Sequence, residues 1–262
     1  MSRTDVIIQG YLFKYGTPLI CVIILYMIVA SYFESVRNKL YALYVIKCDN
    51  VYERMTKHYK KELFSPLHSL VSANWKLRNQ GLIRILEIGV RTGQNLKYYP
   101  KNSHVILADR NSRLEKHFKS ADYKKIDQLN VVKYIQSYGE NLAEIPDESV
   151  DAVVATLVLC SAPDVDRMLG EIWRVLVPGG IYFFLEHIQE PDDPSLRRMQ
   201  NILTKIKVWP YVFDGCHLNR NVKKNIKQIK FKEVNCDHLQ FDMKDPYPLK
   251  FTRTHIIGTA IK

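Results

Sequence analysis

Residues 83–95 read IRILEIGVRTGQN, an apolar run that ends in an acidic residue and then turns on two glycines. Ile, Leu and Val in so short a run are typical of a strand buried on both faces of a parallel sheet. Gly89 and Gly93 remove side chains where the backbone must turn or approach a ligand, and residues 95–99 are expected to begin a helix. A strand, a glycine turn and a helix form the first unit of a nucleotide-binding α/β fold, with the ligand at the strand's carboxyl end.

The spacing of the glycines limits which class of ligand the turn can bind. A dinucleotide-binding turn has three glycines in the pattern G-x-G-x-x-G, so that pyrophosphate can sit on the helix N-terminus. This turn has only Gly89 and Gly93, and Glu87 stands two residues before the first of them. An acidic side chain there repels pyrophosphate but can accept hydrogen bonds from a cationic or amino-bearing ligand. The alternative is an ordinary buried strand and turn with no ligand.

Length and composition indicate one α/β domain with an extension. The chain has 262 residues, a formal net charge of +11 and a pI near 9.3. Such a balance indicates nucleic acid or an anionic membrane surface. We expect membrane lipids rather than nucleic acid, because the lysines of residues 223–232 belong to no recognised nucleic-acid-binding module. The five cysteines contain no C-x-x-C pair, so we expect no metal site and a reducing compartment. They are Cys21, Cys48, Cys160, Cys216 and Cys236.

Residues 15–33 contain no charged side chain. The run has nearly the roughly 20 apolar residues that a spanning helix needs, so residues 1–38 are expected to form an N-terminal membrane anchor. Two alternatives remain open. One is a cleaved signal peptide, although the run exceeds the usual apolar region of such a peptide. The other is a shallow insertion from one side, which Pro18 would permit.

Residues 39–80 are expected to form a helical connector or lid, because the stretch mixes apolar and basic residues too continuously for a solvated linker. Its helices either lie on lipid head groups or pack on the domain and cover its cleft, and the two are compatible. The domain itself is expected to span residues 81–262.

Strand and helix patterns alternate through the domain, as they do in α/β folds. Strands are expected at 105–109, 131–135, 149–160 and 181–187, helices at 164–176 and 196–210, and two late strands at 231–241 and 254–261. Pro178-Gly179-Gly180 is expected to end the helix at 164–176.

Asp109 ends a predicted strand about 20 residues beyond the glycine turn, where an acidic side chain can accept both hydroxyls of a ribose. A lone Asp at a strand end is also a common helix cap. Strand 131–135 leads into Gly139, Glu140 and Asn141, which form either a ligand contact or a capped turn.

Three runs resemble class I S-adenosylmethionine (SAM) methyltransferases: LEIGVRTG at 86–93, SVDAVVATLVL at 149–159 and RVLVPGGIYFFLEH at 174–187. The resemblance implies a Rossmann-like three-layer α/β sandwich whose seven-stranded, mostly parallel sheet ends in a C-terminal antiparallel hairpin. It implies SAM as cofactor, with Glu140 or Asn141 at the adenine edge. The implied cofactor-binding residues are Glu87, Gly89, Gly93, Asp109, Gly139, Glu140, Asn141 and Leu157.

Arg91 departs from this pattern, because the signature has a middle glycine there. Its cation would lie near the sulfonium of SAM. We expect the side chain either to swing outward, with its head in water, or to pair with a carboxylate, that of Glu87 or that of the cofactor. The departure also leaves open a non-catalytic membrane scaffold that kept the fold.

The apolar N-terminus, together with KKELFSPL at 60–67, FDGCHLNR at 213–220 and HIIGTAIK at 255–262, is similar to the membrane-associated thiol S-methyltransferases of methyltransferase-like family seven. That resemblance implies an endoplasmic reticulum membrane protein, found also on lipid droplets, with its catalytic domain facing the cytosol. It implies methyl transfer from SAM to small alkyl thiols or hydrogen sulfide. The alternative acceptor is a lipid or a quinone-like molecule.

The chemistry asks the protein mainly to align the acceptor with the activated methyl group of SAM. A thiol attacks as its thiolate, so a general base or a positive field should help. His187 and Asp214 are the candidate catalytic residues. Their ordinary alternatives are a structural hydrogen bond and a turn cap, and Cys216 is expected to be a packing or pocket residue.

Overall fold

The computed structural model describes residues 25, 31–32, 51–110, 129–242 and 247–262. Contacts divide the chain into two units, Met1–Asp49 and Asn50–Lys262. The predicted anchor lies outside the described residues, apart from Leu25, Ser31 and Tyr32, which are helical. In the part of the chain that is described, no helix is both long and apolar enough to cross a membrane. The division of the chain at residues 38 and 80 stays a prediction.

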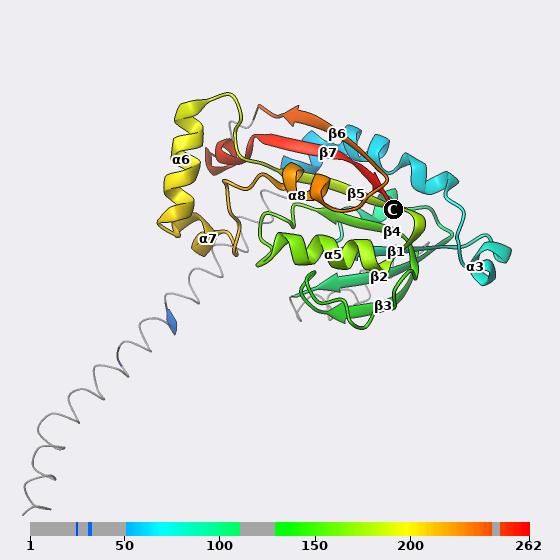
Figure 1. Cartoon of the computed structure of the whole chain (residues 1–262). Helices are drawn as coiled ribbons and strands as arrows, with labels where there is room; N and C mark the ends of the chain where they lie inside the picture. The colour runs from blue at the N-terminus through cyan, green and yellow to red at the C-terminus, as the bar shows by residue number, and fades with distance from the viewer. Residues whose placement is uncertain (1–24, 26–30, 33–50, 111–128, 243–246) are drawn as a thin grey trace, which may run out of the picture. The chain divides into compact units, whose positions relative to one another are not determined.

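A seven-stranded sheet in the order β3-β2-β1-β4-β5-β7-β6 forms the centre of Asn50–Lys262 (Figure 1). The neighbours from β3 to β5 pair in parallel, whereas β7 is antiparallel to both β5 and β6. The predicted mostly parallel sheet with a C-terminal hairpin is therefore confirmed. The strands are β1 (Ile83–Ile88), β2 (Ser103–Asp109), β3 (Asn130–Gln136), β4 (Val150–Thr156), β5 (Leu176–His187), β6 (Glu233–Gln240) and β7 (Thr254–Ile261).

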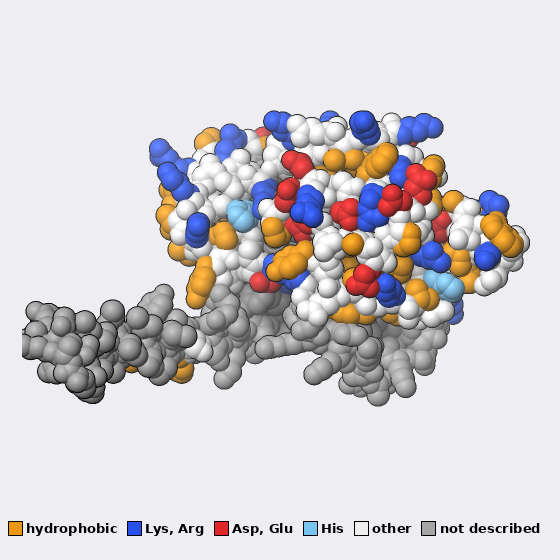
Figure 2. All heavy atoms as spheres, turned by 60° about the horizontal axis from the view of Figure 1, so that its bottom comes forward, with side chains coloured by type: hydrophobic (Ala, Val, Ile, Leu, Met, Phe, Trp, Pro, Cys, Tyr) orange, Lys and Arg blue, Asp and Glu red, His pale blue; other side chains and the backbone are white. Residues whose placement is uncertain are grey.

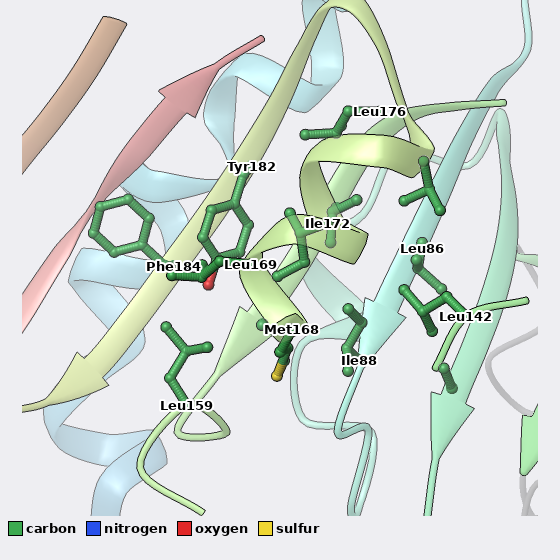
Figure 3. Close-up of a cluster of buried hydrophobic side chains, with 14 of the residues drawn as sticks. Leu86, Ile88, Leu142, Leu159, Met168, Leu169, Ile172, Leu176, Tyr182 and Phe184 are labelled. Atoms are coloured by element: carbon green, nitrogen blue, oxygen red, sulfur yellow. The ribbon is translucent and has the colours of Figure 1, made fainter. Parts of the chain in front are cut away.

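Helices cover both faces of this sheet, because the central strands are apolar on both sides. In β1, Leu86 and Ile88 belong to the core cluster that contains α5 (Val165–Val175), while Ile83 and Ile85 belong to the cluster on the other face. Figure 3 shows the side chains of α5 pointing into the first cluster. Each buried Leu or Ile contributes about 1.5–3 kcal/mol, so this alternation fixes the register of the strands.

The segment before β1 packs on the second face. Residues 51–63 are helical and are followed by the 3-10 turn η2 (Ser65–Ser69). Phe64 is buried against Tyr99 and Phe183, with ring centroids 5.8 and 6.1 Å away. Glu53 accepts hydrogen bonds from the Tyr98 hydroxyl and from Lys97 Nζ, each 2.6 Å long. The connector is thus tied to the turn that follows the glycines, and its contact with lipid head groups stays a prediction.

The helix predicted to begin at residues 95–99 is absent from that segment, which forms only the 3-10 turn η3 (Leu96–Tyr98), because Tyr99 precedes Pro100 and takes an extended backbone. The helix predicted at 164–176 is confirmed to within one residue at each end. Pro178–Gly180, predicted to end that helix, lie instead inside β5, which begins at Leu176 rather than at residue 181. Leu176 is already extended, with φ −66° and ψ 137°, and it pairs with Val150 of β4.

The helix predicted at 196–210 is two helices. Helix α6 (Pro194–Lys205) begins at the N-cap Asp193, whose side chain accepts from Ser195 N and Leu196 N. Lys207 has a left-handed backbone, with φ 59°, so the chain turns before α7 (Val208–Val212). Both helices lie beyond the carboxyl ends of the parallel strands (Figure 1). The remaining elements are α3 (Trp75–Asn79), α8 (Val222–Gln228) and η5 (Tyr247–Thr252).

Candidate cofactor and acceptor site

The glycine turn after β1 has the backbone that only glycine takes without strain. Gly89 and Gly93 both have φ +71°. A Cβ on Gly89 would lie 2.3 Å from Val158 Cγ2, so the β1 turn and the segment after β4 approach closely. The predicted role of both glycines in forming a tight turn fits this geometry.

Arg91 sits between the glycines with φ +48°, a conformation that costs a non-glycine residue about 1–3 kcal/mol. Its backbone N–H donates to Asp109 Oδ2 over 3.1 Å. Asp109 is buried at the end of β2, so the acid predicted for the ribose also holds the glycine turn. The positive φ explains why the signature has a glycine at this position, and the direction of the Arg91 guanidinium stays a prediction.

Glu87 is 1% exposed at the carboxyl end of β1. Its two oxygens accept from Asn95 Nδ2 over 3.0 Å and from the Tyr99 hydroxyl over 2.8 Å. Burial raises the pKa of the Glu87 carboxyl to about 7, although these hydrogen bonds oppose the rise. Among the described residues, no group donates to the buried Asn95 Oδ1. A carboxyl with a raised pKa beside an acceptor oxygen that lacks a donor fits the binding of a cationic amino group such as that of SAM.

The segment after β3 is packed against the start of α5. A Cβ on Gly139 would lie 2.8 Å from Met168 Sδ. Glu140 Oε1 accepts from Asp164 N over 3.1 Å, so this carboxylate fixes the N-terminus of α5. Asn141 is exposed. The assignment of Glu140 or Asn141 to the adenine edge stays a prediction.

Leu157 directly follows β4 and has φ +57°. Its N–H donates to Leu185 O of β5 over 2.8 Å. The chain therefore bends sharply at the carboxyl ends of β4 and β5, next to the strand ends that carry Glu87 and Asp109. This places Leu157 with the other predicted cofactor residues at one edge of the sheet.

Arg110, which sequence reasoning missed, links this edge to the segment after α7. Its guanidinium lies 6.0 Å from the ring centroid of Tyr138. Arg110 Nη2 donates to Asp214 O over 2.7 Å and forms an ion pair with the Asp214 carboxylate. Asp214 is thus exposed and paired with a cation, and the structure does not bring it together with His187. Its role as a base stays a prediction.

His187 is buried at the end of β5 in a sulfur-rich cluster. Its Nε2 lies 3.1 Å from Cys216 Sγ, and Trp209 Nε1 donates to the same sulfur over 3.4 Å. A hydrogen bond from Cys216 and the nearby His187 hold the pKa of the Cys160 thiol well below its usual value. Cys216 therefore does more than fill space, because it hydrogen-bonds the predicted base.

The acid beside this cluster, Glu186, is fully buried. Its Oε1 accepts from the backbone N–H groups of Val158 and Leu159, 2.9 and 3.0 Å away. Burial raises the pKa of Glu186 well above its ordinary value. The carboxyl thus fastens the turn after β4 to the end of β5, which positions Leu157 and Cys160.

We predict that Arg91→Gly changes SAM affinity less than tenfold, or about 1.4 kcal/mol. Glycine removes the strain of φ +48° but leaves the backbone N–H that bonds Asp109. Calorimetric titration with SAM measures the difference. Glu148→Gly is the matched control, since Glu148 also has φ 48° but lies outside the turn. If only the Arg91→Gly variant binds SAM, the arginine blocks the native site.

Comparisons with known proteins agree with this geometry. A family model described as a methyltransferase domain matches residues 86–184. The SAM-dependent methyltransferase structure from Thermotoga maritima is 17% identical, covers 83% of this chain and 95% of its own, and has a TM-score of 0.51. At that identity the likeness shows the fold alone.

Two curated relatives are much more similar. Thiol S-methyltransferase TMT1B of Rattus norvegicus is 36% identical over 205 residues, which are 78% of this chain and 78% of that protein. Thiol S-methyltransferase TMT1A of Homo sapiens is 33% identical over 225 residues, or 86% of this chain and 87% of that protein. The chain is therefore a class I SAM-dependent methyltransferase and belongs to the thiol S-methyltransferase family.

Proposed function

We propose that this protein transfers the methyl group of SAM to the sulfur of small thiols, such as alkyl thiols or hydrogen sulfide. The observation that carries the proposal is the 36% identity over 78% of the chain to a thiol S-methyltransferase. The structure supports it with a buried, apolar and sulfur-containing cluster next to the carboxyl ends of β4 and β5. That cluster contains Cys160, Trp209, Cys216 and Leu218, with Phe213 and Leu203 packed against it.

In this reaction the protein mainly holds and orients SAM and the acceptor, because the methyl group on the sulfonium of SAM is already activated. Asp109 and Glu87 lie at adjacent strand ends, where a ribose and an amino group can be held. The acceptor must approach the methyl carbon in line with the breaking carbon–sulfur bond. A small thiol suits a site next to this apolar cluster better than a highly polar acceptor does.

The test is a set of acceptors that share one carbon skeleton but carry a thiol, an alcohol or an amine, together with an isoprenoid quinol. Initial rates with purified full-length protein and SAM are expected only for the thiol. Methylation of the quinol in preference to the thiol would make the lipid or quinone alternative correct. SAM binding without transfer to any acceptor would favour the scaffold.

We also propose that the surface of α6 and α7 rests on an anionic membrane. Six large apolar side chains there are exposed: Met199, Ile202, Ile206, Val208, Tyr211 and Val212. Arg197, Arg198, Lys205 and Lys207 lie among them, and residues 194–212 contain no acid. In Figure 2 acidic and basic side chains mix over the centre of the face, whereas basic and hydrophobic side chains gather at its left edge. Apolar side chains with a basic rim suit the head-group region, and each Lys or Arg contributes about 1 kcal/mol.

Reversing two of these charges should release the domain from anionic vesicles. We predict that Arg198→Glu with Lys205→Glu lowers binding of the Asn50–Lys262 unit at least tenfold, measured by flotation at low salt. The matched control is Lys224→Glu with Lys227→Glu on α8, which makes the same change in net charge. Equal losses in both pairs would show attraction by net charge rather than by this surface.

The proposed location is the endoplasmic reticulum membrane, and lipid droplets as well, with the domain in the cytosol. Support comes from the three described cysteines, Cys160, Cys216 and Cys236, which are free thiols as in a reducing compartment. We predict that residues 15–33 are retained as an anchor. N-terminal sequencing of protein from membranes should find the chain beginning before Tyr15, whereas a start near Tyr32 would show a cleaved signal.

A further inference from the structure

Two cysteines and one histidine from segments far apart in the chain lie close together near the carboxyl ends of β4 and β5. Cys160 follows β4, His187 ends β5 and Cys216 lies between α7 and α8. One ligand atom of each lies within 4.8 Å of the others, and all three residues are buried. His187 Nδ1, also buried, has no hydrogen-bond partner among the described residues.

The donor set is that of a soft metal ion. Zinc binds Cys sulfur at about 2.3 Å and His nitrogen at about 2.0–2.1 Å, so tetrahedral ligand atoms lie roughly 3.5–3.8 Å apart. The separations here, at most 4.8 Å, need only small side-chain shifts to reach that spacing. Two thiolates and one dication are also neutral together, which removes the cost of burying unpaired charge. The Trp209 N–H that points at Cys216 Sγ is the kind of outer contact that orients a metal-bound thiolate.

We propose that Cys160, His187 and Cys216 bind one zinc ion, and that the acceptor thiol takes the fourth coordination position as a thiolate. Three protein ligands with one open position characterise catalytic rather than structural zinc sites. The second half of the proposal rests on the proposed thiol methylation, whereas the first half does not.

The position explains how a weakly acidic acceptor becomes a nucleophile. An alkyl thiol that enters the fourth position releases its proton to solvent, and its sulfur lone pair forms a bond to the methyl carbon of SAM. The bond from that carbon to the sulfonium breaks, and its electron pair stays on S-adenosylhomocysteine. The methyl thioether is a neutral and weaker ligand, so it can leave the site.

Metal analysis of the full-length protein tests the binding. Protein prepared under reducing conditions and dialysed against a weak chelator is expected to hold about one zinc per chain. Cys160→Ser and Cys216→Ser should each lose it, and Cys236→Ser, on β6, should keep it. SAM titration of each variant checks folding. A metal-free protein that methylates thiols at an unchanged rate after chelation would overturn the proposal, as would a Cys160–Cys216 disulfide in its place. Copper in place of zinc would also contradict it.

Cobalt substitution tests the fourth position. The thiolate-to-cobalt absorption is expected to change when an alkyl thiol is added and to stay unchanged when the matched alcohol is added. The two failures are distinguishable: bound zinc without thiol methylation would refute the proposed function only. If the protein methylates the thiol but its cobalt spectrum does not change when the thiol is added, only the proposal that the acceptor coordinates the metal is refuted.

Discussion

Asp109→Ala is expected to abolish measurable SAM binding while leaving the protein folded. The carboxylate is buried at the end of β2, where we expect the ribose of SAM, and Oδ2 also accepts from Arg91 N. Losing a buried, charge-assisted pair of hydrogen bonds costs about 2–5 kcal/mol, or roughly 30-fold to several thousand-fold in affinity. Calorimetric titration with SAM measures the loss.

A second buried acid supplies the control for this variant. Asp151 accepts from Ala73 N over 2.9 Å and from Arg84 N over 2.8 Å, at the opposite end of β4 from the cofactor edge. Asp151→Ala should therefore lower the free energy of unfolding without weakening SAM affinity in the folded protein. If a folded Asp109→Ala variant binds SAM as tightly as the wild type, the assignment of Asp109 to the ribose is wrong.

The second large effect is a pH dependence set by Glu87. Its pKa is raised to about 7 from an ordinary 4.5, so the folded state holds this proton more tightly than the unfolded state. The folded state therefore loses stability as pH rises from about 4.5 to 7, by about 3 kcal/mol in total. Glu87→Gln removes this loss, so its stability relative to the wild type should increase between pH 5 and pH 8 by about that amount.

SAM binding should have the opposite dependence, because an ammonium group binds the carboxylate form of Glu87. Affinity is expected to fall roughly tenfold from about pH 7 to about pH 5.5, with a proton released on binding below pH 7. Calorimetry in buffers of different ionisation enthalpy measures both quantities. Parallel pH profiles for the wild type and Glu87→Gln would show that Glu87 does not titrate with the ligand.

The sheet could be predicted because its signals are local. Residues 83–88 and 105–109 are apolar runs with an acid at or next to the end, Glu87 and Asp109. Both runs form parallel strands, with these acids at the same end of the sheet. The two late strands, β6 and β7, could also be predicted from their apolar residues. Asn95 was misjudged as a helix start, since its amide is used by Glu87 and Thr156. That contact exists only after the sheet has formed.

The acceptor side was less predictable, because it is built from segments far apart in the chain. The absence of a C-x-x-C pair led us to expect no metal site, yet Cys160 and Cys216 meet through the packing of α7 against the strand ends. Cys160 lies just after β4 and His187 is the last residue of the neighbouring strand β5, so the sequence does indicate that these two lie close together. Nothing local indicates Cys216, or the pairing of Arg110 with Asp214.

The most direct test of thiol S-methylation is a single-turnover reaction with SAM that carries a trideuterated methyl group. Purified full-length protein, an alkyl thiol and labelled SAM are mixed, and the products are identified by mass spectrometry. Trideuterated methyl thioether and S-adenosylhomocysteine are expected in equal amounts, and neither should form with Asp109→Ala. Bound SAM that stays intact in the presence of the thiol, or label found on any atom other than sulfur, would contradict the account.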